Sequence, residues 1–228
     1  MVPVFLAADN TSNFMAPEIL TVIKGTKIFL VENIRTARRF ISSLNLGVAI
    51  EDLQFHELSK KTPSHEINRL LSPLKNGHDI GVMSESGCPG VADPGAAAAA
   101  GAHRMGARVA PLTGPSSILL ALMASGLNGQ NFTFHGYLPI DKNDRSKAAR
   151  SLEKESQRQS RTQIFIETPY RNQQMFETLL QACQPETKLC IGVDITGKEE
   201  QIETHTISEW KKIKWELHKR PAVFLLQA

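Results

Sequence analysis

Residues suited to binding a small molecule gather between positions 80 and 95, where a short apolar run meets a loop rich in glycine and proline. The run Ile-Gly-Val-Met is typical of a strand, and the loop that follows it holds Gly87, Gly90 and Gly95. Glycine lets backbone N–H groups come close to a ligand, and α/β sheets bind their ligands beyond the carboxyl ends of the strands. We therefore predict a ligand site in the loop at residues 84–95.

A second turn of similar type, Thr-Gly-Pro-Ser-Ser, occupies residues 113–117. The hydroxyls of Ser116 and Ser117 stand where the N-cap of a following helix is expected. One such turn alone is explained as an ordinary capped turn, whereas two turns that each follow a strand of one sheet favour a cofactor crevice. The sequence contains no GxGxxG, P-loop, HExxH or GxSxG pattern, which disfavours the common dinucleotide-binding enzymes, P-loop NTPases, zincins and α/β-hydrolases.

Apolar runs of strand length alternate with helical patterns along most of the chain. Strands are predicted at residues 4–7, 27–31, 79–83, 108–112, 131–135, 162–166, 188–193, 201–206 and 222–227. Helices are predicted at residues 16–24, 35–44, 64–75, 96–105, 116–125, 145–159, 171–182 and 208–213. Strands separated by single helices indicate an α/β fold with largely parallel sheets, and two closely spaced returns near the C-terminus add antiparallel strands there. A change in composition near the second turn predicts two domains, at residues 1–112 and 113–228.

The composition is that of an ordinary globular protein, with 41% hydrophobic and 21% charged residues and a formal net charge of +3. Cys88, Cys183 and Cys190 lack the spacing of a metal site, so we expect no metal. No apolar run approaches the roughly 20 residues that cross a bilayer, and the N-terminus lacks the basic region of a signal peptide. We therefore expect a cytoplasmic protein without a membrane segment.

Several short motifs, in the same order, resemble those of a known family. Residues 84–95, Ser-Glu-Ser-Gly-Cys-Pro-Gly-Val-Ala-Asp-Pro-Gly, resemble the Ser-Asp-Ala-Gly-Thr-Pro-Gly-Ile-Ser-Asp-Pro-Gly loop of the tetrapyrrole methylase superfamily, in its ribosomal RNA small subunit methyltransferase I branch. Further matches are Val-Glu-Asn-Ile-Arg-Thr at 31–36, the turn at 113–117, Phe-His-Gly-Tyr-Leu-Pro at 134–139, Glu-Thr-Pro-Tyr-Arg at 167–171 and Lys-Arg-Pro-Ala-Val-Phe at 219–224. The resemblance covers residues from about 27 to 228.

This resemblance implies a methyltransferase that uses S-adenosylmethionine. It implies two αβα domains, with a mostly parallel sheet in the first, a mixed sheet in the second, and a cofactor cleft between them. The branch forms homodimers and methylates the 2′-hydroxyl of a cytidine ribose in small-subunit ribosomal RNA. By analogy, the cofactor-binding residues would be Glu85, Gly87, Cys88, Val91, Ser116, Ser117, Ile166, Val193, Asp194, Pro221 and Ala222.

Methyl transfer to a hydroxyl requires donor and acceptor to be held in line, and a positioned base assists it. Glu167, at the end of a predicted strand, is the candidate for that base. The alternative, equally weighted, is that Glu167 orients Arg171 through an ion pair. Glu85 and Asp93 are further candidates for the base, less favoured than Glu167, and Asp93, which precedes Pro94, would alternatively cap the helix that begins near residue 96.

A basic stretch is the candidate surface for RNA. Residues 142–171 contain eight Lys or Arg against four Asp or Glu. Lys147, Arg150, Lys154 and Arg158 recur at helical spacing, so they should form one stripe that contacts phosphates, although an ordinary solvated face has the same pattern. The predicted RNA-binding residues are Arg35, Arg145, Lys147, Arg150, Lys154 and Arg171.

Two other functions stay open from the sequence. A tetrapyrrole C-methyltransferase of the same superfamily would be expected to carry Gly-Asp-Pro in its first loop, where this chain has Gly87, Cys88 and Pro89. A paralogue that binds cofactor or RNA without catalysis would explain why residues 7–13 lack the glycine of the family's Thr-Pro-Ile-Gly-Asn-Leu loop.

Overall fold

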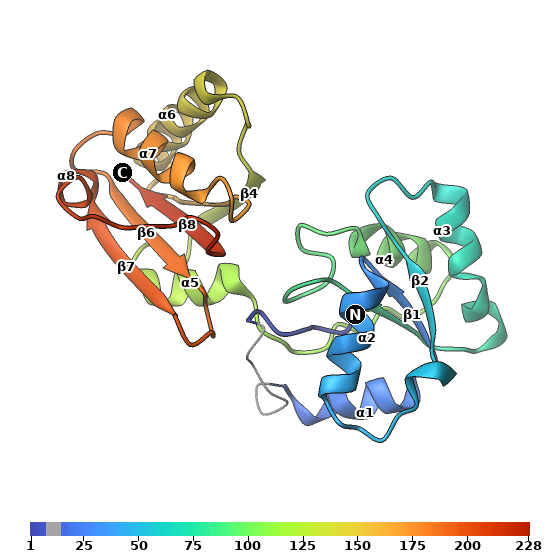
Figure 1. The fold of residues 1–228 in the computed structure, drawn as a ribbon. Coiled ribbons are helices and arrows are strands. Elements are labelled where there is room, and N and C mark those ends of the chain that lie inside the picture. The colour runs from blue at the N-terminus through green and yellow to red at the C-terminus, as the bar shows by residue number, and fades with distance from the viewer. Residues whose placement is uncertain (8–14) are drawn as a thin grey trace. The chain divides into compact units, whose positions relative to one another are not determined.

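The computed structural model describes residues 1–7 and 15–228 and divides the chain into two compact units, Met1–Ser116 and Ser117–Ala228 (Figure 1). The segment at residues 7–13, where the sequence departs from the family's loop, therefore lies outside the described residues except for Ala7. Among the described residues, no helix is long and apolar enough to cross a membrane.

The first unit is built on a parallel sheet with strand order β2-β1-β3. Its strands are β1 (Ile28–Val31), β2 (Gln54–Glu57) and β3 (Ile80–Met83). Its helices are α1 (Pro17–Gly25), α2 (Ile34–Ser43), α3 (Ser64–Leu70) and α4 (Gly95–Arg104), with 3₁₀ turns at Ile50–Asp52 and Ser72–Asn76. β1 is buried along its whole length, as expected for the central strand of a parallel sheet covered on both faces.

Side chains of β1 alternate between two apolar layers. Phe29 and Val31 pack with residues of α1 and α2, whereas Leu30 packs with residues of α3 and α4. Because successive strand residues point to opposite faces, helices cover both sides of this sheet. The first unit is thus an αβα layer structure, as the sequence predicts.

Two predicted strands of the first unit are corrected by the structure. Residues 4–7 and 108–112 form no ladder, although the N-terminal segment does lie beside β3. Val2 N–H donates to Val82 O at 2.8 Å, and Leu112 N–H donates to Met1 O at 3.1 Å. These segments are extended, but isolated hydrogen bonds do not make a strand.

The sequence also missed a strand, β2. Its residues, Gln-Phe-His-Glu, include a single apolar side chain and are exposed at both ends. β2 is an edge strand of the sheet, so it needs less apolar surface than its central neighbour and lacks the pattern by which strands are recognised.

The second unit contains a mixed sheet with strand order β4-β5-β8-β6-β7. Only β4 and β5 run parallel, and the other neighbouring pairs are antiparallel. Its strands are β4 (Phe132–Tyr137), β5 (Thr162–Ile166), β6 (Lys188–Val193), β7 (Gln201–Thr206) and β8 (Ala222–Gln227). Its helices are α5 (Ser117–Ser125), α6 (Lys142–Gln159), α7 (Asn172–Ala182) and α8 (Ile207–Trp210). A parallel sheet in the first unit and a mixed sheet in the second confirm the predicted fold class.

In the second unit, α5 lies on one face of the sheet, and α6 and α7 lie on the other (Figure 1). The start of α6 shows how a local cap sets a boundary. Asp141 accepts hydrogen bonds from the backbone N–H groups of Asn143 and Asp144, at 2.8 and 3.0 Å. This N-cap starts the helix at Lys142, three residues before the predicted start.

Candidate functional site

In the first unit, the loop at residues 84–95 leaves the carboxyl end of β3 and closes on itself. Asp93 Oδ1 accepts hydrogen bonds from the N–H groups of Gly90 and Gly95, both at 2.7 Å. Gly95 is the first residue of α4, so Asp93 accepts the first N–H of this helix, although the N-cap position itself is Pro94. The carboxylate thus ties the middle of the loop to the start of the helix.

Gly87 is held where a side chain has no room. Its φ is +71°, in the left-handed region that favours glycine, and its carbonyl accepts Val4 N–H at 3.0 Å. A Cβ placed on it would lie 2.9 Å from Leu6 Cδ2 and 3.2 Å from Pro115 O. The loop is therefore a cradle that a side chain at this position would disturb.

Cys88 joins the two predicted turns within the first unit. Its thiol donates to Pro115 O at 3.3 Å, so the loop at 84–95 contacts the turn at 113–117. Burial raises the pKa of Cys88, with a smaller contribution from the nearby charge of Asp93, so the thiol stays neutral at neutral pH. Cys88 is a packing and hydrogen-bonding residue here and not a thiolate nucleophile.

Glu32 is a site residue that the cofactor prediction did not include. It follows β1 directly, and its Oε1 accepts Glu85 N–H at 3.1 Å. Burial raises the pKa of Glu32 by more than this hydrogen bond lowers it. The signal that would have found it is its position, since Val31 pairs with Met83 in the parallel ladder and both strands end at the same edge.

A cavity of about 390 Å³ opens at this edge of the first unit. Its walls include Leu6, Thr36, Phe40, Ser84 and Glu85. The volume falls within the range of small-molecule sites, about 300–1,000 Å³. A second cavity, of about 220 Å³, lies at the opposite end of β3 among apolar side chains, and we do not assign the site there because none of the predicted cofactor residues lines it.

The predicted cofactor residues of the second unit gather at one edge of its sheet. Val193 pairs with Ala222, and Ile166 pairs with Val223, so the carboxyl ends of β5 and β6 meet the start of β8. Asp194 N–H donates to Pro221 O at 3.0 Å. The sheet topology thus brings together residues separated by more than fifty positions in the chain.

The carboxylate of Asp194 points toward the backbone of the loop that follows β6. Its Oδ2 accepts Glu199 N–H at 3.0 Å, and the residue has a φ of +48°, unusual for a non-glycine residue. The loop after β6 is consequently held in one conformation by its own side chain.

Glu167 and Arg171 form an ion pair at the same edge. Glu167, 5% exposed, accepts hydrogen bonds through Oε1 from Thr168 N–H at 2.6 Å and from Arg171 Nη2 at 2.7 Å. The hydrogen bond to Glu167 raises the pKa of the Arg171 guanidinium, and Tyr137 also contributes. Of the two roles considered for Glu167, this geometry matches the orientation of Arg171.

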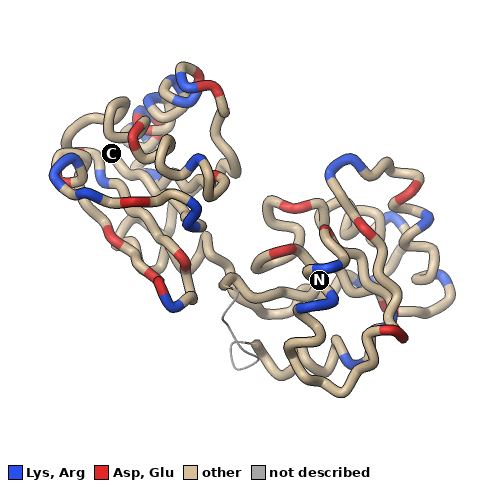
Figure 2. Tube along the Cα trace, viewed as in Figure 1, with Lys and Arg blue, Asp and Glu red and all other residues tan. Residues whose placement is uncertain are grey.

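The basic residues of α6 divide into an exposed group and a buried one. Figure 2 shows Lys and Arg positions recurring along α6. Arg150, Lys154 and Arg158 are exposed along the helix, and Lys147 is exposed while paired with Asp144 at 3.1 Å. Within the described part of the chain, no ion pair engages Arg150, Lys154 or Arg158. These three side chains retain their charge for an external partner.

Arg145 is a correction to the predicted RNA-binding set. It is 4% exposed, and it donates to Thr178 Oγ1 at 3.1 Å and to Ile140 O at 2.9 Å. The guanidinium thus braces the start of α6 against α7 and is not available to phosphates. Its position on the buried side of the helix, toward α7, separates it from the stripe.

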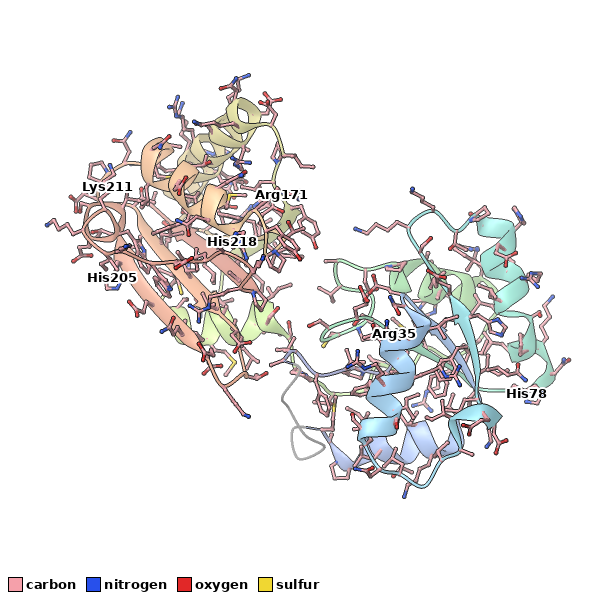
Figure 3. The ribbon with its side chains drawn as sticks, in the orientation of Figure 1. Arg35, His78, Arg171, His205, Lys211 and His218 are labelled. Atoms are coloured by element: carbon pink, nitrogen blue, oxygen red, sulfur yellow. The ribbon has the colours of Figure 1, made fainter. Side chains whose placement is uncertain are left out.

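The remaining predicted residues lie on accessible parts of their own units. Arg35 is exposed near the start of α2, and Arg171 lies at the start of α7 (Figure 3). Glu85 and Val91 are exposed on the first loop, and Ser116 and Ser117 are half-buried. Among the residues described, no cluster of three or more His, Cys, Asp or Glu is arranged to hold a metal ion.

Comparison with known proteins gives the family. The model of the tetrapyrrole (corrin/porphyrin) methylases matches residues 17–211. Proteins named ribosomal RNA small subunit methyltransferase I are similar to this chain: that of Vibrio cholerae is 28% identical over 83% of this chain and 63% of its own length. Those of Bacillus subtilis and Mesorhizobium japonicum are 27% and 33% identical, over 83% and 82% of this chain and 62% and 61% of their own lengths. This chain therefore matches less than two thirds of the length of these relatives.

Solved structures share the fold. The methyltransferase CobJ superposes with a TM-score of 0.63 at 17% identity, covering 96% of this chain and 90% of that one. Uroporphyrin-III C-methyltransferase of Thermus thermophilus, complexed with S-adenyl homocysteine, gives 0.54 at 17% identity, covering 94% and 91%. With the family model matching most of the chain, this protein belongs to the tetrapyrrole (corrin/porphyrin) methylases.

Proposed function

We propose that this protein is an S-adenosylmethionine-dependent methyltransferase that modifies a ribose 2′-hydroxyl in small-subunit ribosomal RNA. The observation that carries the proposal is its likeness, over 83% of its length, to relatives named ribosomal RNA small subunit methyltransferase I. The described geometry supports the cofactor part of it. The loop at 84–95 follows the end of β3, and Ile166, Val193 and Ala222 lie at strand ends of the second unit's own sheet.

The first-unit loop fits a cofactor of this kind. Gly87 leaves a cradle that a Cβ would crowd, and Cys88 braces it with a neutral thiol. Gly87, Cys88 and Val91, with the strand-end residues Ile166 and Val193, are the proposed binding residues, together with Glu85, Ser116, Ser117, Asp194, Pro221 and Ala222. When bound, S-adenosylmethionine would supply a methyl group bonded to a positively charged sulfur. The substrate hydroxyl oxygen would bond to the methyl carbon as the carbon–sulfur bond breaks, and the hydroxyl proton would be released to solvent.

The protein's own residues would promote methyl transfer mainly by positioning the substrate, and less by acid–base catalysis. Glu167 is buried and already accepts two hydrogen bonds, one of them from Arg171. We therefore assign Glu167 to holding Arg171, and Arg171 to contact with an anionic part of the substrate.

The RNA part of the proposal uses the exposed stripe of α6. Arg150, Lys154 and Arg158 succeed one another at four-residue spacing and carry no ion pair among the described residues. Such a stripe contacts phosphates without reading bases, so it supplies affinity and register, not sequence choice. Lys147 would extend this stripe, and Arg35 of the first unit is proposed as a separate RNA contact. We also propose a cytoplasmic homodimer, by analogy with the family.

The test examines cofactor binding and substrate identity in two separate steps. Titration calorimetry with S-adenosylmethionine asks first whether the cofactor binds. Tritiated cofactor is then incubated with small ribosomal subunits from a strain that lacks the corresponding ribose methylation, with normally methylated subunits as the control. We expect micromolar binding and label only on the unmethylated subunits. Failure to bind cofactor would overturn the methyltransferase, whereas binding without label on either subunit preparation would overturn the ribosomal substrate alone.

A further inference from the structure

The turn that follows β5 lies between two other strand ends. In the sheet order β4-β5-β8, Tyr137 closes β4 and pairs with Ile166, while residues 218–220 lead into β8 on the other side. The turn itself, residues 167–171, carries Tyr170 and Arg171. Side chains from three separate segments are thus brought to one edge of the second unit, where Arg171 and His218 are seen in Figure 3.

Hydrogen bonds hold this turn from several sides. Thr168 N–H donates to Glu167 Oε1 at 2.6 Å, and Arg171 N–H donates to Thr168 O at 2.9 Å. From the neighbouring segment, Lys219 N–H donates to Pro169 O at 2.9 Å. The backbone of the turn is therefore fixed both by its own residues and by the adjacent strand connection.

The side chain that this rigid turn presents is an exposed aromatic ring. Tyr170 is 68% exposed, and Tyr137 at the end of β4 is 50% exposed. The only ring packed against Tyr170 among the described residues is that of His218, edge-on with centroids 6.4 Å apart. An exposed tyrosine at this position adds little to the core of the unit, so its face is available to another molecule.

Two cationic side chains lie on the segments that form this turn. Arg171, which is paired with Glu167, follows Tyr170 directly, and Lys219 comes from the facing segment. No carboxylate forms an ion pair with Lys219 in the part of the chain that the structure describes. An aromatic face flanked by cations matches an unpaired nucleotide, whose base stacks on the ring while its phosphates meet the charges.

We propose that Tyr170 is a stacking platform for an unpaired base of the RNA substrate, with Lys219 contacting its phosphate backbone. This inference rests on the proposed function, because it names how that substrate is held. Single-stranded RNA is the favoured partner over a duplex, since bases in a helix are already stacked and cannot lie on the ring. Arg171, which pairs with Glu167 and follows Tyr170 in the chain, then lies between the bound base and the predicted cofactor residues at the end of β5.

The experiment compares Tyr170→Leu with Tyr170→Phe. Phenylalanine keeps the ring and loses only the hydroxyl, whereas leucine keeps an apolar side chain without a ring, so the pair separates the effect of the ring from that of the hydroxyl. The probe is a fluorescein-labelled 12-nucleotide oligocytidylate, measured by fluorescence anisotropy beside a 12-base-pair RNA duplex. Stacking is worth about 1–3 kcal/mol per base, so Tyr170→Leu should weaken binding of the single strand by about 5- to 160-fold, while Tyr170→Phe should change it by less than about twofold.

Phe132→Leu is the matched control, because Phe132 is also an exposed aromatic residue, 39% exposed, but lies at the opposite end of β4. It should leave binding of both probes as in the original protein. Affinity for S-adenosylmethionine should be retained in all three variants, which also shows that they are folded.

Several results would overturn the inference. Equal single-strand affinity for Tyr170→Leu and the original protein would do so, as would an equal loss for the single strand and the duplex. If Tyr170→Leu instead alters the oligomeric state in sedimentation velocity and leaves RNA affinity intact, the ring is a subunit contact and the proposal is wrong. An original protein that binds S-adenosylmethionine but neither probe would remove both this inference and the RNA substrate, while the methyltransferase assignment would stand.

Discussion

Substitution of Gly87 by alanine is the most direct probe of the cradle in the first unit. An alanine at a φ of +71° adopts the left-handed conformation, which costs about 1–2 kcal/mol. Its Cβ would also lie 2.9 Å from Leu6 Cδ2 and 3.2 Å from Pro115 O. Leu6 can shift the end of a flexible side chain, but Pro115 O belongs to the backbone, and such overpacking costs about 1–3 kcal/mol. The expected destabilisation is therefore about 2–5 kcal/mol.

Gly106 supplies a control that separates the two contributions. It has the same φ, +71°, and lies in the same unit, but a Cβ built on it meets nothing within 4 Å. Gly106→Ala should thus lose only the conformational part, about 1–2 kcal/mol. The difference between the two alanine variants, about 1–3 kcal/mol, measures how closely Leu6 and Pro115 pack against the loop.

The assay is urea unfolding followed by circular dichroism, together with calorimetric titration of S-adenosylmethionine. Gly87→Ala should bind the cofactor at least tenfold more weakly, because the loop must move to make room for the alanine side chain. Gly106→Ala should bind the cofactor normally. If the two variants unfold at the same urea concentration, the close packing at Gly87 is wrong. Normal cofactor affinity in Gly87→Ala would refute the assignment of this loop to the cofactor site.

Three further predictions address the ion pair, the buried acid and the basic stripe. Glu167→Gln should lower the free energy of unfolding by about 1.5–3 kcal/mol, because Arg171 loses its charged partner, and a double-mutant cycle with Arg171→Gln that finds no coupling would contradict this. Glu32 has a folded-state pKa raised above 4.5, chiefly by burial, so its proton is held more tightly in the folded unit. The stabilisation that Glu32 adds to the free energy of unfolding is full below pH 4.5 and is lost as the pH rises through the folded-state pKa. Glu32→Gln should flatten this part of a plot of unfolding free energy against pH, and an unchanged plot would contradict the raised pKa. Charge reversal of Arg150 and Lys154 should weaken single-stranded RNA binding and reduce the slope of log K against log salt by about 1.4, with cofactor affinity as the control; an unaltered slope would exclude the stripe from the RNA contact.

Local pattern predicts the boundaries of β5, β6, β7 and β8. β5, β6 and β8 are mostly buried and apolar, whereas β7 is a half-exposed edge strand whose β-branched residues alternate with polar ones. The edge strand β2 has only one apolar residue in four and is not predicted, and the apolar residues 4–7 form only isolated hydrogen bonds in place of the predicted strand. Apolar runs thus identify buried strands, but they do not say which extended segments complete a ladder.

Residue type and spacing also placed the stripe of α6 but not its buried member. Arg145 and Arg150 look alike in the sequence, and only the packing of α6 against α7 separates a guanidinium bonded to Thr178 from one exposed to solvent. Helical periodicity gives the relative directions of side chains, while the neighbouring element decides which direction is inside.

The sequence by itself determined the glycine-rich loop, the alternation of strands and helices, and the family motifs, because each of these is a property of consecutive residues. The tertiary structure alone decided which distant residues meet. Glu32 reaches the loop because β1 and β3 are neighbours in register, and Val193 meets Ala222 because β8 lies beside β6. Strand order and register depend on how the whole sheet is packed, so no single stretch of sequence contains them.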